Sequence, residues 1–156
     1  MDNENIIIAI DGPTGTGKSI TSQLLAEKLG FAYYDTGVFY RAVTLLVLKN
    51  NIKLNDYLAI CKTAQTLDIR FENGKVLMNG LDISKLLKGI EITNKVSGIS
   101  KIGKLRQIIS SRITKLNDGT TNMVVEGKDI GNDVFPKAKF KFFLVSDLGA
   151  RIARRQ

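Results

Sequence analysis

The stretch Gly12-Pro-Thr-Gly-Thr-Gly-Lys-Ser19 constrains this chain more than any other feature, because it matches the pattern GxxxxGK[ST]. It lies between an unbroken apolar run, Ile6–Ile10, and a helical pattern that begins at Ser19. A strand, a glycine-rich turn and a helix N-terminus together direct backbone N–H groups and a partial positive charge toward one point. The sequence therefore predicts a loop that wraps a phosphate group.

Each residue type in this loop has a physical role in binding a nucleoside triphosphate. The glycines let the backbone approach a phosphate without a Cβ clash. Lys18 is predicted to reach the β- and γ-phosphates, and the Ser19 hydroxyl to ligate Mg²⁺. A glycine turn followed by a surface lysine is the alternative interpretation. The predicted ATP-binding residues are Gly12, Pro13, Thr14, Gly15, Thr16, Gly17, Lys18 and Ser19.

The order of apolar patterns along the chain predicts an α/β fold, in which helices pack on a parallel sheet. The predicted strands are Ile6–Ile10, Phe31–Tyr34, Asn122–Glu126 and Phe140–Val145. The first helix is expected to carry Ile20, Leu24, Leu25 and Leu29 on one side and to end at Gly30. Further helices are predicted from Gly37, over Asp56–Leu67, over Glu91–Ser100, around Leu105–Leu116 and from Asp147 onward.

A change of pattern in the middle of the chain predicts a small antiparallel insert. Three short extended segments, Asp68–Glu72, Lys75–Met78 and Leu81–Ile83, are separated by two Asn-Gly pairs. Asn-Gly favours a two-residue hairpin, because both central residues of that turn need a positive φ. The sequence therefore predicts a three-stranded meander that interrupts the alternation of strands and helices.

Length and composition exclude several classes of protein. A chain of 156 residues is long enough for one compact domain. The formal net charge of +8 favours an anionic partner or solubility. The absence of histidine excludes His-based triads and His metal sites. The only cysteine, Cys61, lies on an apolar helix stripe and is predicted to be buried, so we expect no disulfide and a cytoplasmic location. The N-terminus is not typical of a signal peptide, and no apolar run is long enough for a membrane span.

A second motif, Asp35-Thr-Gly-Val-Phe-Tyr-Arg41, follows the second predicted strand. Ligands of open α/β folds bind at the carboxyl edge of the sheet, where this motif is expected to lie. Thr36 offers a hydroxyl and Arg41 a bidentate guanidinium, which suits a second phosphate. A helix cap and a surface arginine would explain the same residues.

Three stretches together resemble the bacterial cytidylate kinases, which are P-loop nucleoside monophosphate kinases. They are IAIDGPTGTGKS, DTGVFYRAVTL and VVEGKDIGNDVFPKAKFKFFL, and the resemblance covers residues 5–156. It implies a three-layer P-loop kinase sandwich on a parallel sheet. It also implies phosphorylation of CMP or dCMP by ATP with Mg²⁺, carried out by a cytoplasmic monomer with no nucleic-acid or membrane partner.

The resemblance assigns roles to individual positions. Arg41 and Arg106 match arginines that hold the monophosphate, and Ser97 matches a serine that contacts the cytosine edge. Lys128 stands where the family usually has arginine. Lysine keeps the positive charge but cannot make the planar, bidentate contact of a guanidinium with phosphate. The implied catalytic residues are Lys18, Arg41 and Asp129. The implied acceptor-binding residues are Thr36, Arg41, Ser97, Arg106, Lys128 and Asp129.

The resemblance also implies a division of the chain. The expected kinase core comprises residues 1–60 and 104–156, and the expected monophosphate-binding insert spans about residues 61–103. The segment containing Arg151, Arg154 and Arg155 resembles the start of the family's lid. The rest of the lid, the last strand and the terminal helix are expected to be missing.

Three alternative functions remain open at this point. A shortened kinase fragment would bind nucleotide without turning it over. A basic nucleic-acid-binding protein would need clustered basic and aromatic residues, which the sequence lacks. A kinase for another small substrate would share the phosphate loop and differ in its preferred acceptor.

Overall fold

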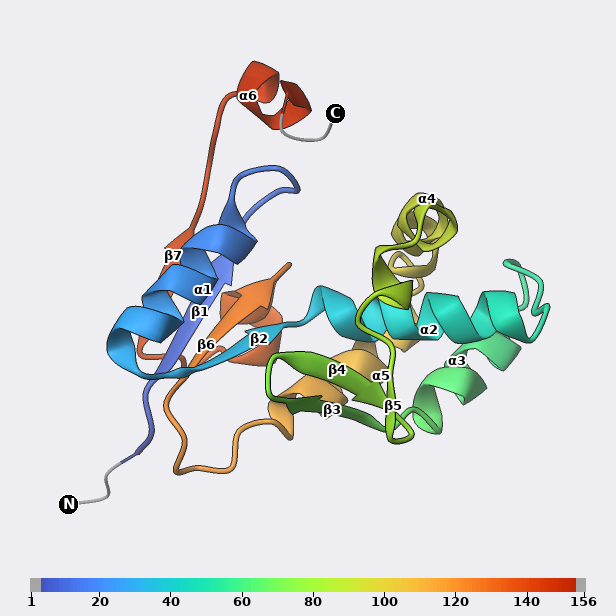
Figure 1. The fold of residues 1–156 in the computed structure, drawn as a ribbon, viewed down its shortest axis with the longest axis horizontal. Helices are drawn as coiled ribbons and strands as arrows, with labels where there is room; N and C mark the ends of the chain where they lie inside the picture. Colours follow the sequence, from blue (N-terminus) through green and yellow to red (C-terminus); the bar gives the residue numbers. More distant parts are fainter. Residues whose placement is uncertain (1–3, 154–156) are drawn as a thin grey trace. The chain divides into compact units, whose positions relative to one another are not determined.

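The computed structural model describes residues 4–153. The chain forms two compact units, one comprising Met1–Thr36 with Ile113–Gln156 and the other comprising Gly37–Arg112. Figure 1 shows the path of the chain through both. These units do not test the division into kinase core and monophosphate-binding insert, which stays a prediction.

The first unit is built on a four-stranded sheet with the order β2-β6-β1-β7. Every neighbouring pair of strands is parallel, as predicted, so all four carboxyl ends lie at one edge of the sheet. The register places Asp11 beside Gly127, and Asp35 beside Glu126. The strands are β1 (Ile7–Asp11), β2 (Ala32–Asp35), β6 (Met123–Gly127) and β7 (Phe140–Phe143).

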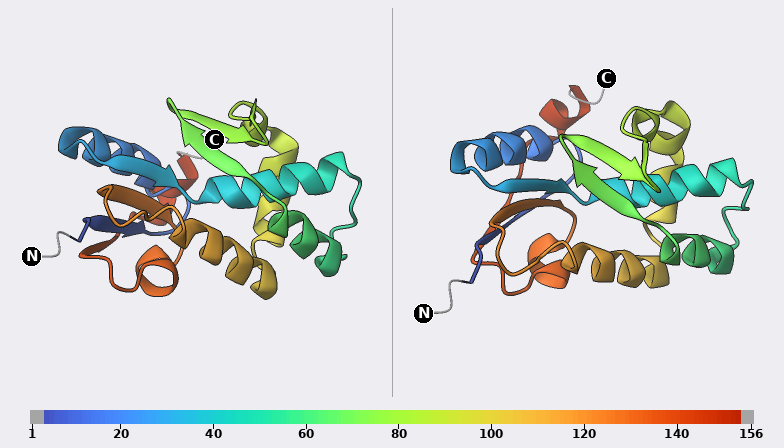
Figure 2. Two further views of the ribbon diagram at one scale, coloured as in Figure 1. Left: turned by 90° about the horizontal axis from the view of Figure 1, so that it is seen from below. Right: turned by 60° about the horizontal axis from the view of Figure 1, so that its bottom comes forward.

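Helix α1 (Lys18–Leu29) and a π-helical turn, η2 (Ile130–Val134), contact the sheet of the first unit. They lie on opposite faces, and Figure 2 shows the strands between them. On the α1 face the core consists of Ile8, Ile10, Ala26 and Val124. The turn η2 was not predicted from the sequence.

The apolar side predicted for α1 is not the side that packs on the sheet. Ile20, Leu24 and Leu29 are 68%, 52% and 46% exposed, and only Leu25 packs against the core. The helix instead turns its small residues, Ser22 and Ala26, toward the sheet. Small side chains allow a helix backbone to approach a sheet closely, so burial here follows residue size as well as hydrophobicity.

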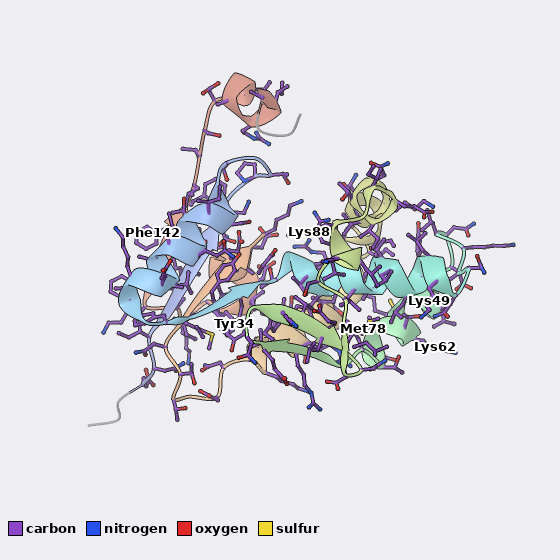
Figure 3. All side chains as sticks on the ribbon, viewed as in Figure 1. Tyr34, Lys49, Lys62, Met78, Lys88 and Phe142 are labelled. Carbon is purple, nitrogen blue, oxygen red and sulfur yellow. The ribbon has the colours of Figure 1, made fainter. Side chains whose placement is uncertain are left out.

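Strand β7 forms an edge of the sheet, and its side chains remain largely accessible. Phe142, labelled in Figure 3, is 51% exposed, and Phe143 is 68% exposed. The predicted strand is confirmed as far as Phe143, although Val145 lies beyond its end. The last helix of this unit, α6, spans Leu148–Ala153.

The second unit combines helices with the predicted meander. Strands β3 (Ile69–Glu72), β4 (Lys75–Met78) and β5 (Leu81–Asp82) form an antiparallel sheet in that order. The turn residues Asn73 and Gly74 have φ values of 50° and 73°. Asn79 and Gly80 have φ values of 51° and 80°, so both predicted hairpin turns are confirmed.

The helical part of the second unit supplies most of its core. Its elements are α2 (Gly37–Lys49), α3 (Tyr57–Gln65), η1 (Leu86–Lys88), α4 (Ile90–Ile99) and α5 (Gly103–Thr114), the last of which crosses the boundary between the units. Phe39 and Phe71 meet with ring centroids 6.0 Å apart. Cys61 is 3% exposed, which confirms the predicted burial of its thiol. Within residues 4–153, no helix has both the length and the apolar character that crossing a membrane requires.

Candidate active site

The phosphate loop connects β1 to α1 in a conformation that depends on its glycines. Gly12, Gly15 and Gly17 have φ values of 146°, 83° and 91°, a region that residues with a Cβ rarely adopt. Inside the loop, the Pro13 carbonyl accepts hydrogen bonds from the Thr16 hydroxyl at 2.9 Å and from the Lys18 ammonium at 2.8 Å. The loop therefore keeps the lysine folded over its own backbone, at the N-terminus of α1.

Lys18 lies among groups that act on its charge in opposite directions. Burial lowers the pKa of Lys18, and the carboxylates of Glu126, Asp35 and Asp11 oppose that shift. Lys128 adds a second positive charge that lowers the pKa further. The phosphate loop and the end of β6 therefore share one electrostatic environment.

Glu126 is a buried carboxylate that the sequence analysis did not assign to the site. It lies on β6, the strand that pairs with the phosphate-loop strand β1, and it is 2% exposed. The Tyr33 hydroxyl donates a hydrogen bond to Glu126 Oε1 at 2.5 Å. Burial raises the pKa of Glu126, and burial together with the bond to Glu126 raises the pKa of Tyr33. A carboxylate that ends a buried strand was the sequence signal for this residue.

The donor atoms near Ser19 fit a magnesium ion that accompanies a nucleotide. The Ser19 hydroxyl lies close enough to Glu126 and Tyr33 to lower the pKa of each. A hydroxyl and carboxylate oxygens are the hard ligands that Mg²⁺ prefers, and Mg²⁺ usually takes its other ligands from water and phosphate. Among residues 4–153, no group of three or more His, Cys, Asp or Glu residues is arranged to hold a metal by protein ligands alone.

The raised pKa of Glu126 predicts a pH-dependent effect of the substitution E126Q. Between the ordinary pKa of a glutamate and the raised one, the folded protein binds more protons than the unfolded chain, so ionisation of Glu126 destabilises the fold as pH rises. Glutamine keeps the shape and cannot ionise. We therefore expect E126Q to become more stable relative to the parent chain as the pH rises from about 5 to about 8.

Urea denaturation without Mg²⁺ at both pH values measures this difference. The matched control is E27Q, a change at an exposed glutamate of α1. If E126Q gained no stability relative to the parent chain as the pH rises, the assigned effect of burial on Glu126 would be contradicted.

Thr36 fastens the end of β2 to the end of β6. Its backbone N–H and its hydroxyl both donate to the Glu126 carbonyl, at 3.0 and 2.9 Å, and the residue is 3% exposed. The structure therefore places the Thr36 hydroxyl in a hydrogen bond with the backbone. Its role toward a nucleotide stays a prediction.

Lys128 and Asp129 are exposed at the carboxyl end of β6, in the loop before η2. Asp129 has a left-handed backbone conformation, with φ 59° and ψ 29°. The structure thus brings together at one sheet edge the phosphate loop, Thr36, Glu126 and this loop, all of them within the first unit.

The start of the predicted lid also meets the phosphate loop within the first unit. Arg151 Nε donates to the Thr14 carbonyl at 2.9 Å. A Cβ built on Gly15 would lie 3.0 Å from the Arg151 carbonyl, so the two segments are in close contact. Arg154 and Arg155, assigned to the same predicted lid, lie outside the described residues.

The remaining predicted acceptor residues belong to the second unit, where they are grouped around α4. Arg41 Nη1, from α2, donates to Thr93 Oγ1 at 3.2 Å and to the Leu87 carbonyl at 3.1 Å. Arg106 Nη1 donates to the carbonyl of Ser100, the C-cap residue after α4, at 3.4 Å. Ser97 is exposed, and its carbonyl accepts from the Ser100 hydroxyl at 3.0 Å.

Two of these three predicted residues contact α4, and the third, Ser97, lies on it. Thr93 and Ser97 are four residues apart, so their side chains share one face of the helix. The two arginines contact α4 at Thr93 and at Ser100, on either side of Ser97. Sequence reasoning identified the arginines and the serine but missed Thr93, which gave no motif signal.

Comparisons with known proteins agree with this arrangement of motifs. The cytidylate kinase family profile matches residues 8–156. The chain is 44% identical over 155 residues to a cytidylate kinase of Caldanaerobacter subterraneus subsp. tengcongensis, covering 99% of this chain and 69% of that protein. It is 41% identical over 155 residues to the Desulforamulus reducens cytidylate kinase, covering 97% and 69%.

A third curated relative gives the same picture. The cytidylate kinase of Fusobacterium nucleatum subsp. nucleatum is 38% identical over 152 residues, covering 97% of this chain and 69% of that protein. A crystal structure of a Thermus thermophilus protein aligns with 15% identity and a TM-score of 0.45 over 97% of this chain and 71% of its own, and it takes no part in the assignment. On the extent and identity of the sequence matches, this chain belongs to the cytidylate kinase family.

Proposed function

We propose that this chain transfers the γ-phosphoryl group of ATP to CMP or dCMP. An oxygen of the acceptor phosphate forms the new bond to the γ-phosphorus, the bond to the β-phosphate oxygen breaks, and the products are ADP and CDP or dCDP. The observation that carries the proposal is the placement of the phosphate loop and the Lys128–Asp129 loop at the same edge of one parallel sheet. Family membership supplies the nucleotide specificity.

The chain's own groups are suited to phosphoryl transfer, which depends on positioning and charge neutralisation. The backbone N–H groups of the loop and the N-terminus of α1 would hold the triphosphate. The Lys18 ammonium would leave the Pro13 carbonyl and bind the β- and γ-phosphates. The acceptor oxygen is already anionic, so no strong general base is required.

Mg²⁺ would be held through the Ser19 hydroxyl beside Glu126, and when bound it neutralises charge on the β- and γ-phosphates. The bond from Tyr33 fixes the Glu126 carboxylate, which keeps an acceptor next to Ser19. Glu126 and Tyr33 would thereby orient the side chain that would receive the ion.

Each unit carries residues that the family assigns to the acceptor nucleotide. Arg41 and Arg106 would hold its phosphate, and Ser97, between their two contacts with α4, would contact the cytosine edge. In the first unit, Lys128 and Asp129 would contact the acceptor from the end of β6. Because Lys128 is a point charge without the planar fork of arginine, we expect a looser grip on the monophosphate at this position.

We further infer a cytoplasmic monomer that acts on free nucleotides and has no nucleic-acid partner. The one cysteine is buried, and the basic residues are spread along the chain. Light scattering on an eluting size-exclusion peak would measure the molar mass. A dimer mass across a dilution series would contradict the inferred oligomeric state.

Coupled measurement of ADP release tests the proposed activity. With ATP and Mg²⁺, we expect ADP formation that depends on CMP or dCMP and is much weaker with UMP or AMP. Isothermal titration with an imido analogue of ATP reports nucleotide binding separately. A folded chain that binds the analogue and forms no ADP with CMP would contradict the proposed activity and leave a nucleotide-binding fragment.

A further inference from the structure

Asp11 is the last residue of β1 and directly precedes the phosphate loop, yet its side chain contacts another segment. Its Oδ1 accepts a hydrogen bond from the Ile130 N–H at 2.6 Å. Its Oδ2 accepts one from the Gly131 N–H at 2.8 Å. Both carboxylate oxygens therefore bind the backbone of the turn that follows Lys128 and Asp129.

The backbone around Asp129 depends on where this turn is held. Asp129 is left-handed, with φ 59°, an uncommon conformation for a residue with a side chain. Its carbonyl accepts from the Asp133 N–H at 2.9 Å, which continues the turn. A Cβ on Gly131 would lie 3.3 Å from Asp11 Oδ2, so the carboxylate and the turn are packed closely. The two bonds to Asp11 thus hold the backbone that directly follows Lys128 and Asp129.

The charge of Asp11 does not suit a role in binding the triphosphate. A carboxylate next to the phosphate loop repels phosphate, and it is one of the three carboxylates that raise the pKa of Lys18. Loss of that charge would, if anything, favour a polyanion at the loop. Its contribution must therefore come through the backbone that it holds.

We infer that Asp11 is a positioning residue for the acceptor nucleotide, because its carboxylate fixes the loop that presents Lys128 and Asp129. This inference rests on the proposed function, in which that loop binds the acceptor. Strand β1, which leads into the phosphate loop, would then also hold the loop that binds the acceptor. Removing the carboxylate should therefore weaken acceptor binding without weakening triphosphate binding.

The substitution D11N tests the inference. Asparagine keeps one acceptor oxygen and places an NH₂ group against an N–H, so one hydrogen bond and the negative charge are lost. We expect CMP binding, measured by isothermal titration, to weaken about 10- to 100-fold. Binding of the imido analogue of ATP with Mg²⁺ should stay unchanged or become tighter. In amide hydrogen exchange, Ile130 and Gly131 should lose protection.

A matched control is D118N, in the same unit. Asp118 also holds a turn, since its Oδ1 accepts from the N–H groups of Thr120 and Thr121 at 2.8 and 2.7 Å. It is exposed and lies outside the proposed site. We expect D118N to leave the affinity for both nucleotides unchanged.

Three results would overturn the inference: unchanged CMP binding in D11N, equal weakening for both nucleotides, or full protection of both amides. If the parent chain itself does not bind CMP, the proposed function fails. In that case amide exchange in D11N still decides whether Asp11 holds the loop.

Discussion

The substitution K18M is expected to lower CMP-dependent ADP formation by about 10²- to 10³-fold in kcat, the loss seen when one preorganised charge-stabilising donor is removed. Lys18 is the cation that the phosphate loop places at the N-terminus of α1. Methionine retains the unbranched stem and removes the ammonium. Because the lysine contacts a loop carbonyl and lies outside the buried core, the fold should tolerate the change.

Steady-state kinetics with saturating CMP measure this effect, and thermal unfolding of K18M verifies that the chain is folded. K28M is the matched control, because Lys28 lies on the same helix and is exposed. Activity of folded K18M within a few-fold of the K28M value would exclude Lys18 from the transfer step.

The substitution G12A is expected to lower the free energy of unfolding by about 3–5 kcal/mol, because it combines overpacking with backbone strain. A Cβ at position 12 would lie 2.4 Å from the Leu144 carbonyl oxygen, a backbone atom that cannot rotate away. Gly12 also has a φ of 146°, which residues with a Cβ avoid. Relief of the clash requires β1 and the segment after β7 to separate.

Urea denaturation monitored by circular dichroism measures this loss. G119A separates the two causes, because Gly119 also has a positive φ, 77°, while its added Cβ would meet nothing within 4 Å. G119A should cost only about 1–2 kcal/mol. Equal losses for the two variants would show that close packing against Leu144 contributes nothing.

Local patterns were enough to predict most of the fold. Strands β1 and β6 each contain a short apolar run in the sequence, and both Asn-Gly pairs form the expected turns. The apolar side of α1 was misjudged, because periodicity shows that Ile20 and Leu24 share a face but not whether that face meets the sheet. In α1 the small residues Ser22 and Ala26 decide the contact.

The candidate site was predictable only where its residues lie close together in the sequence. The phosphate loop is one continuous motif, so the sequence alone was sufficient to identify it. The bond between Tyr33 and Glu126 spans 93 positions, and those from Asp11 to the turn after Asp129 span 119 and 120. Such contacts follow from the strand order β2-β6-β1, which no local pattern encodes.

The division of the chain into two units has a consequence for synthesis on the ribosome. Gly37–Arg112 is one continuous segment, whereas the other unit combines the two ends of the chain. Strand β1 has no hydrogen-bonded neighbour until β6, more than a hundred residues later, has been synthesised. Segments with local contacts fold faster than those that wait for distant partners. The middle of the chain can therefore fold during translation, while the phosphate loop stays without its sheet until the C-terminal part emerges.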